Sequence, residues 1–163
     1  MERKLAYIFT FAILALLSVN DETVFAQESS QHFIASVSEY YSPNTNASTY
    51  EIGFGYQFPK VGLKINFSEV GLSEGNCVYG EYITISIPAL SMHSFEMIPE
   101  VSTGILHGRF STNEDKAIKG QIQIGVAINY NLSNSMSCGL QYKTLHYGHN
   151  TLSLIGWNYS LHF

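Results

Sequence analysis

The chain has 163 residues and a formal net charge of −5, with only 13% charged residues against 45% hydrophobic and 13% aromatic residues. Its mild acidity and the absence of a Lys/Arg cluster argue against a nucleic-acid partner. After the first 26 residues, no apolar run reaches the roughly 20 residues that a transmembrane helix needs, so insertion into a membrane would require strands.

The first segment, residues 1–26, has the parts of a secretory signal peptide. A basic start precedes an apolar run from Leu5 to Val19, and the predicted cleavage point follows Ala26. An uncleaved membrane anchor is the alternative, but a run of about 15 residues is short for a membrane-spanning helix. Cleavage leaves a mildly acidic mature segment, 27–163.

Turn-forming residues divide the mature segment into eight runs that have the period-two alternation of β-strands. The expected strands cover residues 32–41, 49–58, 61–69, 78–87, 94–110, 118–131, 136–147 and 152–163. Residues 88–93 are expected to turn the chain, and a two-residue turn at 148–149 is expected to join the last two runs. Pro99 interrupts the fifth run, where it should break a central ladder unless it lies at a bulge.

The last run shows the alternation most clearly, because one face is apolar and the other is small or polar. The apolar face carries Ile155, Trp157, Tyr159, Leu161 and Phe163. A strand of this kind that ends at an aromatic residue resembles the last strand of a bacterial outer-membrane β-barrel. Eight strands of about ten residues are typical of the smallest barrels of this class.

The sequence therefore predicts an all-β fold, namely an eight-stranded antiparallel transmembrane β-barrel in the bacterial outer membrane. Its polar inner face would fill a lumen too narrow for a channel, which argues against a porin. A soluble periplasmic β-sandwich is the alternative, and it would have to bury the apolar faces against a second sheet.

The two-residue turn at 148–149 fixes the pairing of the last hairpin. It places His146 opposite Thr151, and Thr144 opposite Ser153, all on the face that points to lipid. Directly opposite residues have Cβ atoms about 5 Å apart, so the imidazole of His146 can act as a general base on a hydroxyl of the next strand. The alternative is an interfacial belt, in which polar and aromatic side chains anchor the barrel at headgroup level.

The segment 142–150, Tyr-Lys-Thr-Leu-His-Tyr-Gly-His-Asn, resembles the active-site strand of the PagL-type lipid A 3-O-deacylases. The turn at 56–62 and the strand at 156–163 fit the same family more loosely. Members of this family are eight-stranded outer-membrane barrels whose strand carries His-x-Ser-Asn, with His as base and Ser as nucleophile facing the lipid. The resemblance implies that His146 is the base and that the substrate is an ester-linked acyl chain of lipopolysaccharide.

One departure from the family pattern concerns the nucleophile. Gly148, which has no hydroxyl, stands where the nucleophilic Ser is expected. A relocated nucleophile is therefore expected at Thr151 or at Ser153, which His146 would reach diagonally. A shifted arrangement, with His149 as the base for Thr151, is a further alternative.

A second departure concerns the acid that orients the base. No Asp or Glu follows Lys116, so the carboxylate that normally supports the charged imidazole is missing from this part of the chain. Glu96 and Glu100 of the fifth run are the candidates to replace it.

Two classes of function follow. The first is a lipid A deacylase, which His146 and its outward direction favour. The second is a non-catalytic barrel that binds lipid or a surface partner through the loops near 42–48, 70–77 and 111–117, and the missing Ser and acid favour it. No metal or organic cofactor is implied, since no His/Cys/carboxylate cluster or Gly-rich phosphate loop is present. The sequence leaves open whether a homodimer forms and whether Cys77 and Cys138 pair.

Overall fold

The computed structural model describes residues 31–72, 76–92, 94–111 and 115–163, so the predicted signal peptide at 1–26 lies outside the described residues. No helix that could cross a membrane is present in the described part of the chain. The strands are β1 (His32–Ser42), β2 (Ala47–Gln57), β3 (Gly62–Gly71), β4 (Cys77–Ser86), β5 (Leu90–Met92), β6 (Phe95–Gly108), β7 (Ala117–Ser133), β8 (Met136–Tyr147) and β9 (Asn150–His162).

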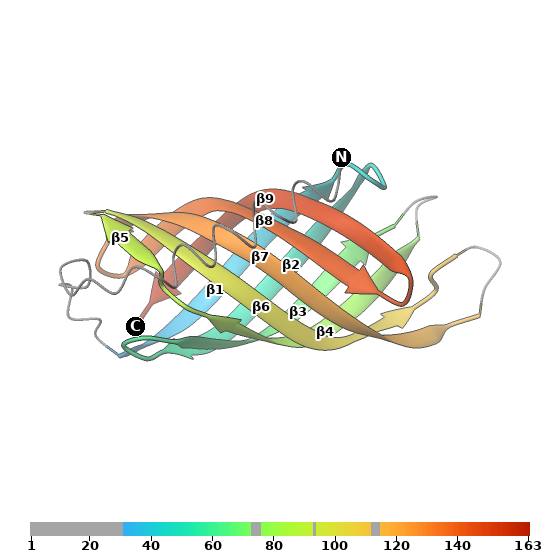
Figure 1. Cartoon of the computed structure of the whole chain (residues 1–163), viewed down its shortest axis with the longest axis horizontal. Helices are drawn as coiled ribbons and strands as arrows, with labels where there is room; N and C mark the ends of the chain where they lie inside the picture. Colours follow the sequence, from blue (N-terminus) through green and yellow to red (C-terminus); the bar gives the residue numbers. More distant parts are fainter. Residues whose placement is uncertain (1–30, 73–75, 93, 112–114) are drawn as a thin grey trace.

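The strands close into a barrel because each long strand pairs antiparallel with a neighbour on both sides. The order around the wall is β4-β3-β2-β1-β9-β8-β7-β6, and β4 also pairs with β6. The short β5 pairs with one end of β6, so the wall consists of eight long strands. The predicted eight-stranded antiparallel barrel is confirmed, and Figure 1 shows its strands running obliquely around an elongated body.

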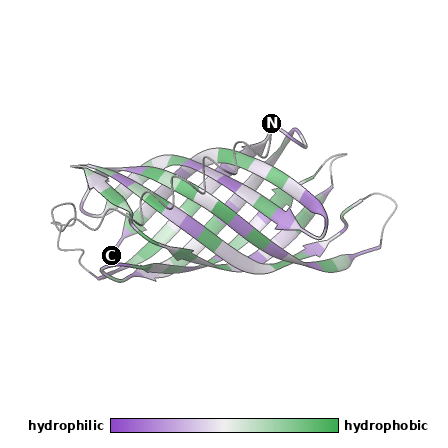
Figure 2. Ribbon diagram, viewed as in Figure 1, coloured by the Kyte–Doolittle hydropathy of each residue, from purple (hydrophilic) through white to green (hydrophobic). Residues whose placement is uncertain are grey.

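The outer wall is apolar and much of the inner face is small or polar, as the period-two pattern predicts. Along β7, Ile122, Ile124 and Ile128 are exposed, whereas Gln121 and Gln123 are buried. The same alternation on the other strands gives the ribbon its chequered hydropathy in Figure 2. An apolar surface of this extent is suited to lipid and would be a liability in water.

Two ion pairs cross the middle of the lumen. Lys64 Nζ lies 3.0 Å from Glu100 Oε1. Lys143 Nζ lies 2.6 Å from Glu51 Oε2, which also accepts a hydrogen bond from the Tyr82 hydroxyl. All four charged side chains are buried, and their pairing offsets the cost of removing them from water. The pairs tie β2, β3, β6 and β8 together across the lumen.

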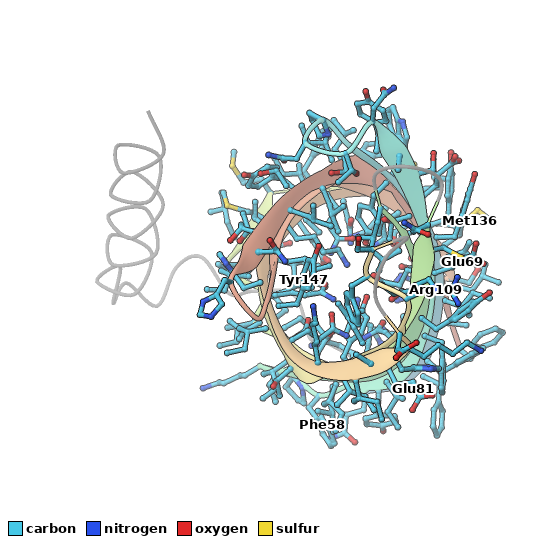
Figure 3. The ribbon with its side chains drawn as sticks, turned by 90° about the vertical axis from the view of Figure 1, so that its right-hand side faces the viewer. Phe58, Glu69, Glu81, Arg109, Met136 and Tyr147 are labelled. Carbon is cyan, nitrogen blue, oxygen red and sulfur yellow. The ribbon has the colours of Figure 1, made fainter. Side chains whose placement is uncertain are left out.

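One end of the lumen is closed by apolar side chains. The apolar plug consists of Tyr40, Val70, Leu72, Val78, Leu106, Leu145, Tyr147, Leu152 and Leu154, all buried. Phe110 from the β6–β7 connection packs against this plug, and its ring stacks on that of Tyr147 with centroids 5.6 Å apart. Figure 3 looks along the barrel and shows Tyr147 inside the ring of strands. The expected polar inner face thus holds for the middle of the lumen but not for this end.

The expected turn at 88–93 is wrong in part, because β5 continues the line of β4 along β6. Ser86 pairs with Glu100, whereas Leu90 pairs with Met97. Four steps on one strand therefore match three on the other, so one extra residue is accommodated between β4 and β5. This is the geometry of a bulge.

That bulge explains how Pro99 fits inside β6. The carbonyl of Pro99 accepts a hydrogen bond from the Ile87 N–H at 3.1 Å, within the irregular segment between β4 and β5. In an antiparallel strand, the N–H and C=O of one residue point to the same side. The missing N–H of Pro99 therefore faces the irregular segment, and the pairing of Pro99 with Val126 on β7 is intact.

The two ends of the barrel differ in the length of their connections. One end carries only short connections, namely the turns at 58–61 and 134–135 and the connection between β5 and β6. The other end carries the turns at 43–46 and 148–149 together with the longer connections at 72–76 and 109–116. The C-terminus lies at the short-turn end and the β8–β9 hairpin lies at the long-loop end (Figure 1). In outer-membrane barrels the short turns face the periplasm and the longer loops face the exterior. This rule predicts that the hairpin at 148–149 lies at the exterior end.

The two cysteines lie near opposite ends of the wall. Cys77 begins β4 at the long-loop end, whereas Cys138 lies near the start of β8 at the short-turn end. Both are free, which answers the question that the sequence left open.

Candidate active site on the outer wall

The β8–β9 hairpin has the two-residue turn that the sequence predicts. Tyr147 pairs with Asn150, and Gly148 has a φ of +55° whereas that of His149 is not positive. A positive φ at the first central position alone is the pattern of a type II′ turn, which favours Gly there. Gly148 therefore serves the turn, and a Ser in its place would be strained. The backbone thus gives a reason why the nucleophile position of the PagL-type pattern is not filled in this chain.

The register places His146 opposite Thr151, as predicted. His146 Nδ1 lies 2.9 Å from Thr151 Oγ1, and both side chains are exposed on the outer wall. The direction of this hydrogen bond depends on the imidazole tautomer. With the ring proton on Nε2, Nδ1 accepts the hydrogen bond from the hydroxyl, which is the arrangement a general base needs.

The second candidate hydroxyl, Ser153, lies two residues further along β9. It pairs with Thr144, and its N–H donates a hydrogen bond to Asn44 Oδ1 at 3.1 Å. Among the described residues its hydroxyl has no hydrogen bond to His146. Of the two candidate nucleophiles, Thr151 is therefore the one that the structure brings to the base.

Neither candidate acid can reach His146, so this expectation is wrong. Glu100 points into the lumen and is bound to Lys64. Glu96 pairs with Asn129 near the short-turn end, and β7 separates its strand from β8. Among the described residues no carboxylate forms an ion pair with His146. The expectation failed because strand parity turns Glu100 inward and the order of the sheet keeps β6 away from β8.

After His146 and Thr151, the next outward pair along β8 and β9 is Thr144 and Ser153, and the wall beside and beyond these polar residues is apolar. Ile122 pairs with His146 from the β7 side, and Ile155 and Trp157 continue the outward face of β9 below Thr151. All three are exposed. An acyl chain can pack on this surface with its ester at the level of the His146–Thr151 pair.

The histidines elsewhere on the barrel do not form a comparable site. Ser137 Oγ lies 3.0 Å from His162 Nε2, and His162 Nδ1 lies 2.8 Å from His32 Nε2. This order of groups is that of a nucleophile, a base and an orienting partner, but Ser137 is only 1% exposed. A substrate cannot reach it, so these residues join the ends of β1, β8 and β9 at the short-turn end.

Two further histidines, His107 and His149, lie in the described part of the barrel. His107 Nε2 lies 3.7 Å from Glu81 Oε1, across β6 and β4, and no described hydroxyl is hydrogen-bonded to this imidazole. His149 is exposed in the turn and has no hydrogen bond to Thr151 among the described residues. The shifted arrangement of His149 with Thr151 is therefore not formed.

Asn44 is a neighbour of the site that sequence reasoning missed. It lies in the turn between β1 and β2, and its contact with Ser153 spans 109 residues. The Ser-Pro-Asn-Thr-Asn segment at 42–46 is recognisable as a turn from its residues. Its position beside β9, however, depends on the closure of the barrel between the first and last long strands.

The sequence matches no protein-family model and no curated protein. Several solved structures share the fold. Neisserial surface protein A matches with a TM-score of 0.63 and 8% identity, covering 82% of this chain and 96% of that one. The N-terminal β-barrel domain of Pseudomonas aeruginosa OprF matches with a TM-score of 0.58 and 15% identity, covering 82% and 96%. The outer membrane enzyme PagL matches with a TM-score of 0.54 and 13% identity, covering 78% and 97%.

At these identities the likeness shows the fold. The closed wall, its apolar outer surface and these neighbours define the chain as a small transmembrane β-barrel of the bacterial outer-membrane class. The predicted fold class and its outer-membrane location are thus confirmed. The similarity to PagL is of the same order as the similarity to the other two barrels and does not single out an activity.

Proposed function

We propose that this barrel hydrolyses an ester-linked acyl chain of lipid A, the membrane anchor of lipopolysaccharide, with His146 as general base and Thr151 as nucleophile. The observation that carries the proposal is the 2.9 Å contact between His146 Nδ1 and Thr151 Oγ1 on the lipid-facing wall. The resemblance of the segment 142–150 to the active-site strand of PagL-type deacylases supports the same role for His146.

The proposed chemistry is acyl transfer to Thr151 followed by hydrolysis. Thr151 Oγ1 attacks the ester carbonyl carbon while its proton moves to His146 Nδ1. The tetrahedral intermediate collapses as the C–O bond to the sugar breaks, and the same proton goes to the leaving sugar oxygen. Water, deprotonated by His146, then attacks the acyl carbon. The bond to Thr151 Oγ1 breaks, His146 returns the proton to that oxygen, and a fatty acid is released.

The location of the pair supports a lipid substrate. The hairpin lies at the long-loop end, which faces the exterior in barrels of this class, so the pair would meet the outer leaflet. A side chain on the outer wall reaches a lipid ester without the lipid having to leave the membrane.

The test is mass spectrometry of lipid A from Gram-negative outer membranes that contain the wild type or one of four variants. Wild type should remove one acyl mass, and His146→Ala and Thr151→Val should remove none. Ser153→Ala and His149→Ala are the matched controls, since neither side chain is hydrogen-bonded to the pair among the described residues, and both should act like wild type. Heat-dependent mobility on a gel checks that each barrel is folded.

Two results would contradict the proposal. Loss of activity in Ser153→Ala with activity kept in Thr151→Val would move the nucleophile to Ser153. Unchanged lipid A with folded wild-type protein would refute hydrolysis altogether.

The second candidate function is a non-catalytic barrel that binds lipid or a surface partner through its long-loop end. The observation that favours it is the lack of a carboxylate bound to His146 among the described residues, since the imidazole then lacks the partner that usually orients it. In that case the pair belongs to an interfacial belt that anchors the barrel. Unchanged lipid A in the experiment above is the result this function predicts.

A further inference from the structure

The edge of β9 beside the candidate site has backbone N–H groups that the barrel ladder does not use. The β1–β9 pairing ends at Tyr41 and Ile155, so β9 extends beyond its neighbour towards the hairpin. In an antiparallel pair, hydrogen-bonded and non-hydrogen-bonded positions alternate. Tyr147 and Asn150 flank the two-residue turn and form a hydrogen-bonded pair. Thr151 is therefore at a non-hydrogen-bonded position, and its N–H points away from β8.

Ser153 confirms this direction, because it has the same parity as Thr151. Its N–H points to the β1 side of β9 and donates to Asn44 Oδ1 at 3.1 Å. The N–H of Thr151 points the same way, two residues closer to the turn.

The contact with Ser153 also fixes the orientation of the Asn44 amide. Because Asn44 Oδ1 accepts the hydrogen bond, the NH2 group lies on the other branch of the amide, available as a donor. Among the described residues no hydrogen bond is made by this NH2 group, and the side chain is exposed.

The turn that carries Asn44 is held by its neighbours. The Asn46 N–H donates to the Ser42 carbonyl at 2.8 Å, and the Tyr41 hydroxyl donates to Asn46 Oδ1 at 2.6 Å. Asn46 has a φ of +55°, which closes the turn back towards β2. Asn44 is thus presented to β9 from a turn with its own hydrogen bonds.

We propose that the Asn44 Nδ2 group and the Thr151 N–H together bind the oxyanion that forms on the ester carbonyl oxygen. This rests on the proposed function, because such donors are needed where an attack on a carbonyl develops negative charge. Two donors about 3 Å from one oxygen can be up to roughly 6 Å apart. The N–H groups of Thr151 and Ser153 lie roughly 6.6 Å apart on the same side of β9, so an amide bound to the Ser153 N–H lies within reach of an oxygen that also accepts from the Thr151 N–H. Since the Ser153 N–H is already bound to Asn44, the geometry favours Thr151 as the nucleophile whose own N–H serves the oxyanion.

The test compares Asn44→Ala with Asn44→Asp in acyl release from lipopolysaccharide in mixed micelles. Asn44→Asp keeps an oxygen that can accept the Ser153 N–H but removes the NH2 donor, whereas Asn44→Ala removes both. If Asn44 binds the oxyanion, both variants lose about 10²–10³-fold in kcat, with KM within about twofold of wild type. Asn134→Ala is the matched control, because it removes an exposed amide from the β7–β8 turn at the opposite end of the barrel, and it should keep kcat within about threefold.

The outcomes separate this inference from the function on which it rests. If wild type is active, His146→Ala is inactive and Asn44→Asp retains the wild-type kcat, the oxyanion role is overturned while the hydrolase stands. Loss in Asn44→Ala alone would give Asn44 only a structural role through Ser153 and would overturn the inference too. If wild type releases no acyl chain, the proposed function and the inference both fall.

Discussion

Lys143 and His146 lie three residues apart on β8, yet one serves the inside of the barrel and the other its outside. Lys143 is buried in the lumen, 2.6 Å from Glu51. His146 is exposed on the lipid-facing wall, and its hydrogen bond is to the Thr151 hydroxyl on the neighbouring strand. The same strand therefore carries Lys143, whose ion pair stabilises the barrel from inside, and His146, whose Nε2 has no hydrogen bond among the described residues.

The difference teaches where function can reside in a barrel this narrow. Eight strands leave an interior that side chains fill, so the polar groups of the lumen bind one another and the apolar plug closes one end. A polar pair on an apolar outer wall has no such structural partner. The lumen residues should therefore determine stability, and the wall residues should determine chemistry.

The largest effect is expected from Lys143→Met, which removes one half of a buried ion pair. Glu51 would keep a buried charge without its own cation, because Lys64, which also acts on it, is already paired with Glu100. The Tyr82 hydroxyl would remain as a donor. Such an uncompensated charge lowers the free energy of unfolding by about 3–5 kcal/mol. Denaturant unfolding in lipid vesicles, followed by the fluorescence of the single Trp157, measures this change.

The control for this prediction removes both charges. The double variant Lys143→Met with Glu51→Gln leaves no unpaired charge, so it should recover most of the lost stability. A single variant within about 1 kcal/mol of wild type would mean that the lumen pair is not structural, and the contrast between the two faces of β8 would fail.

The alternation of side chains is local, which is why the sequence alone could predict the fold. Period-two patterning identified the long strands to within a few residues, and the two-residue turn at 148–149 determined the register that places His146 opposite Thr151. What the pattern could not reveal was pairing between distant strands. The partners of Glu51 and Glu100, and the position of Asn44 beside Ser153, depend on barrel closure and on which strands face each other across the lumen.

Two predictions from the sequence were wrong in whole or in part, namely the turn at 88–93 and the role of Glu100 as the acid. The sequence predicted that residues 88–93 turn the chain, but a bulge lets the chain continue along β6 as β5. Glu100 was a candidate acid because the sequence does not reveal its ion pair with Lys64, which is formed between distant strands. Lys64, on a strand with which β6 makes no ladder, holds it inside.

A smaller effect on the free energy of unfolding is expected from Gly148→Ala, which tests whether the type II′ turn beside the site requires glycine. Its φ of +55° is unfavourable for any other residue by about 1–2 kcal/mol. The added Cβ would meet only the Lys119 side chain, at 3.9 Å, so crowding should contribute little. The free energy of unfolding should therefore fall by about 1–2 kcal/mol. Gly120→Ala, where a Cβ would meet nothing within 4 Å and φ is not positive, is the control and should change stability by less than about 0.5 kcal/mol.

The smallest effect on stability is expected from His146→Ala, although this variant should abolish acyl release. Its hydrogen bond to Thr151 is exposed, and surface substitutions usually change the unfolding free energy by about 0.5 kcal/mol or less. Unfolding in vesicles measures this change beside the lipid A mass spectrum of the same variant. A loss of about 2 kcal/mol or more would make the pair structural, and missing activity could then no longer be assigned to chemistry. Stability close to wild type would instead support the contrast between the two faces of β8. Lys143 would then be required for the stability of the barrel, and His146 only for acyl release.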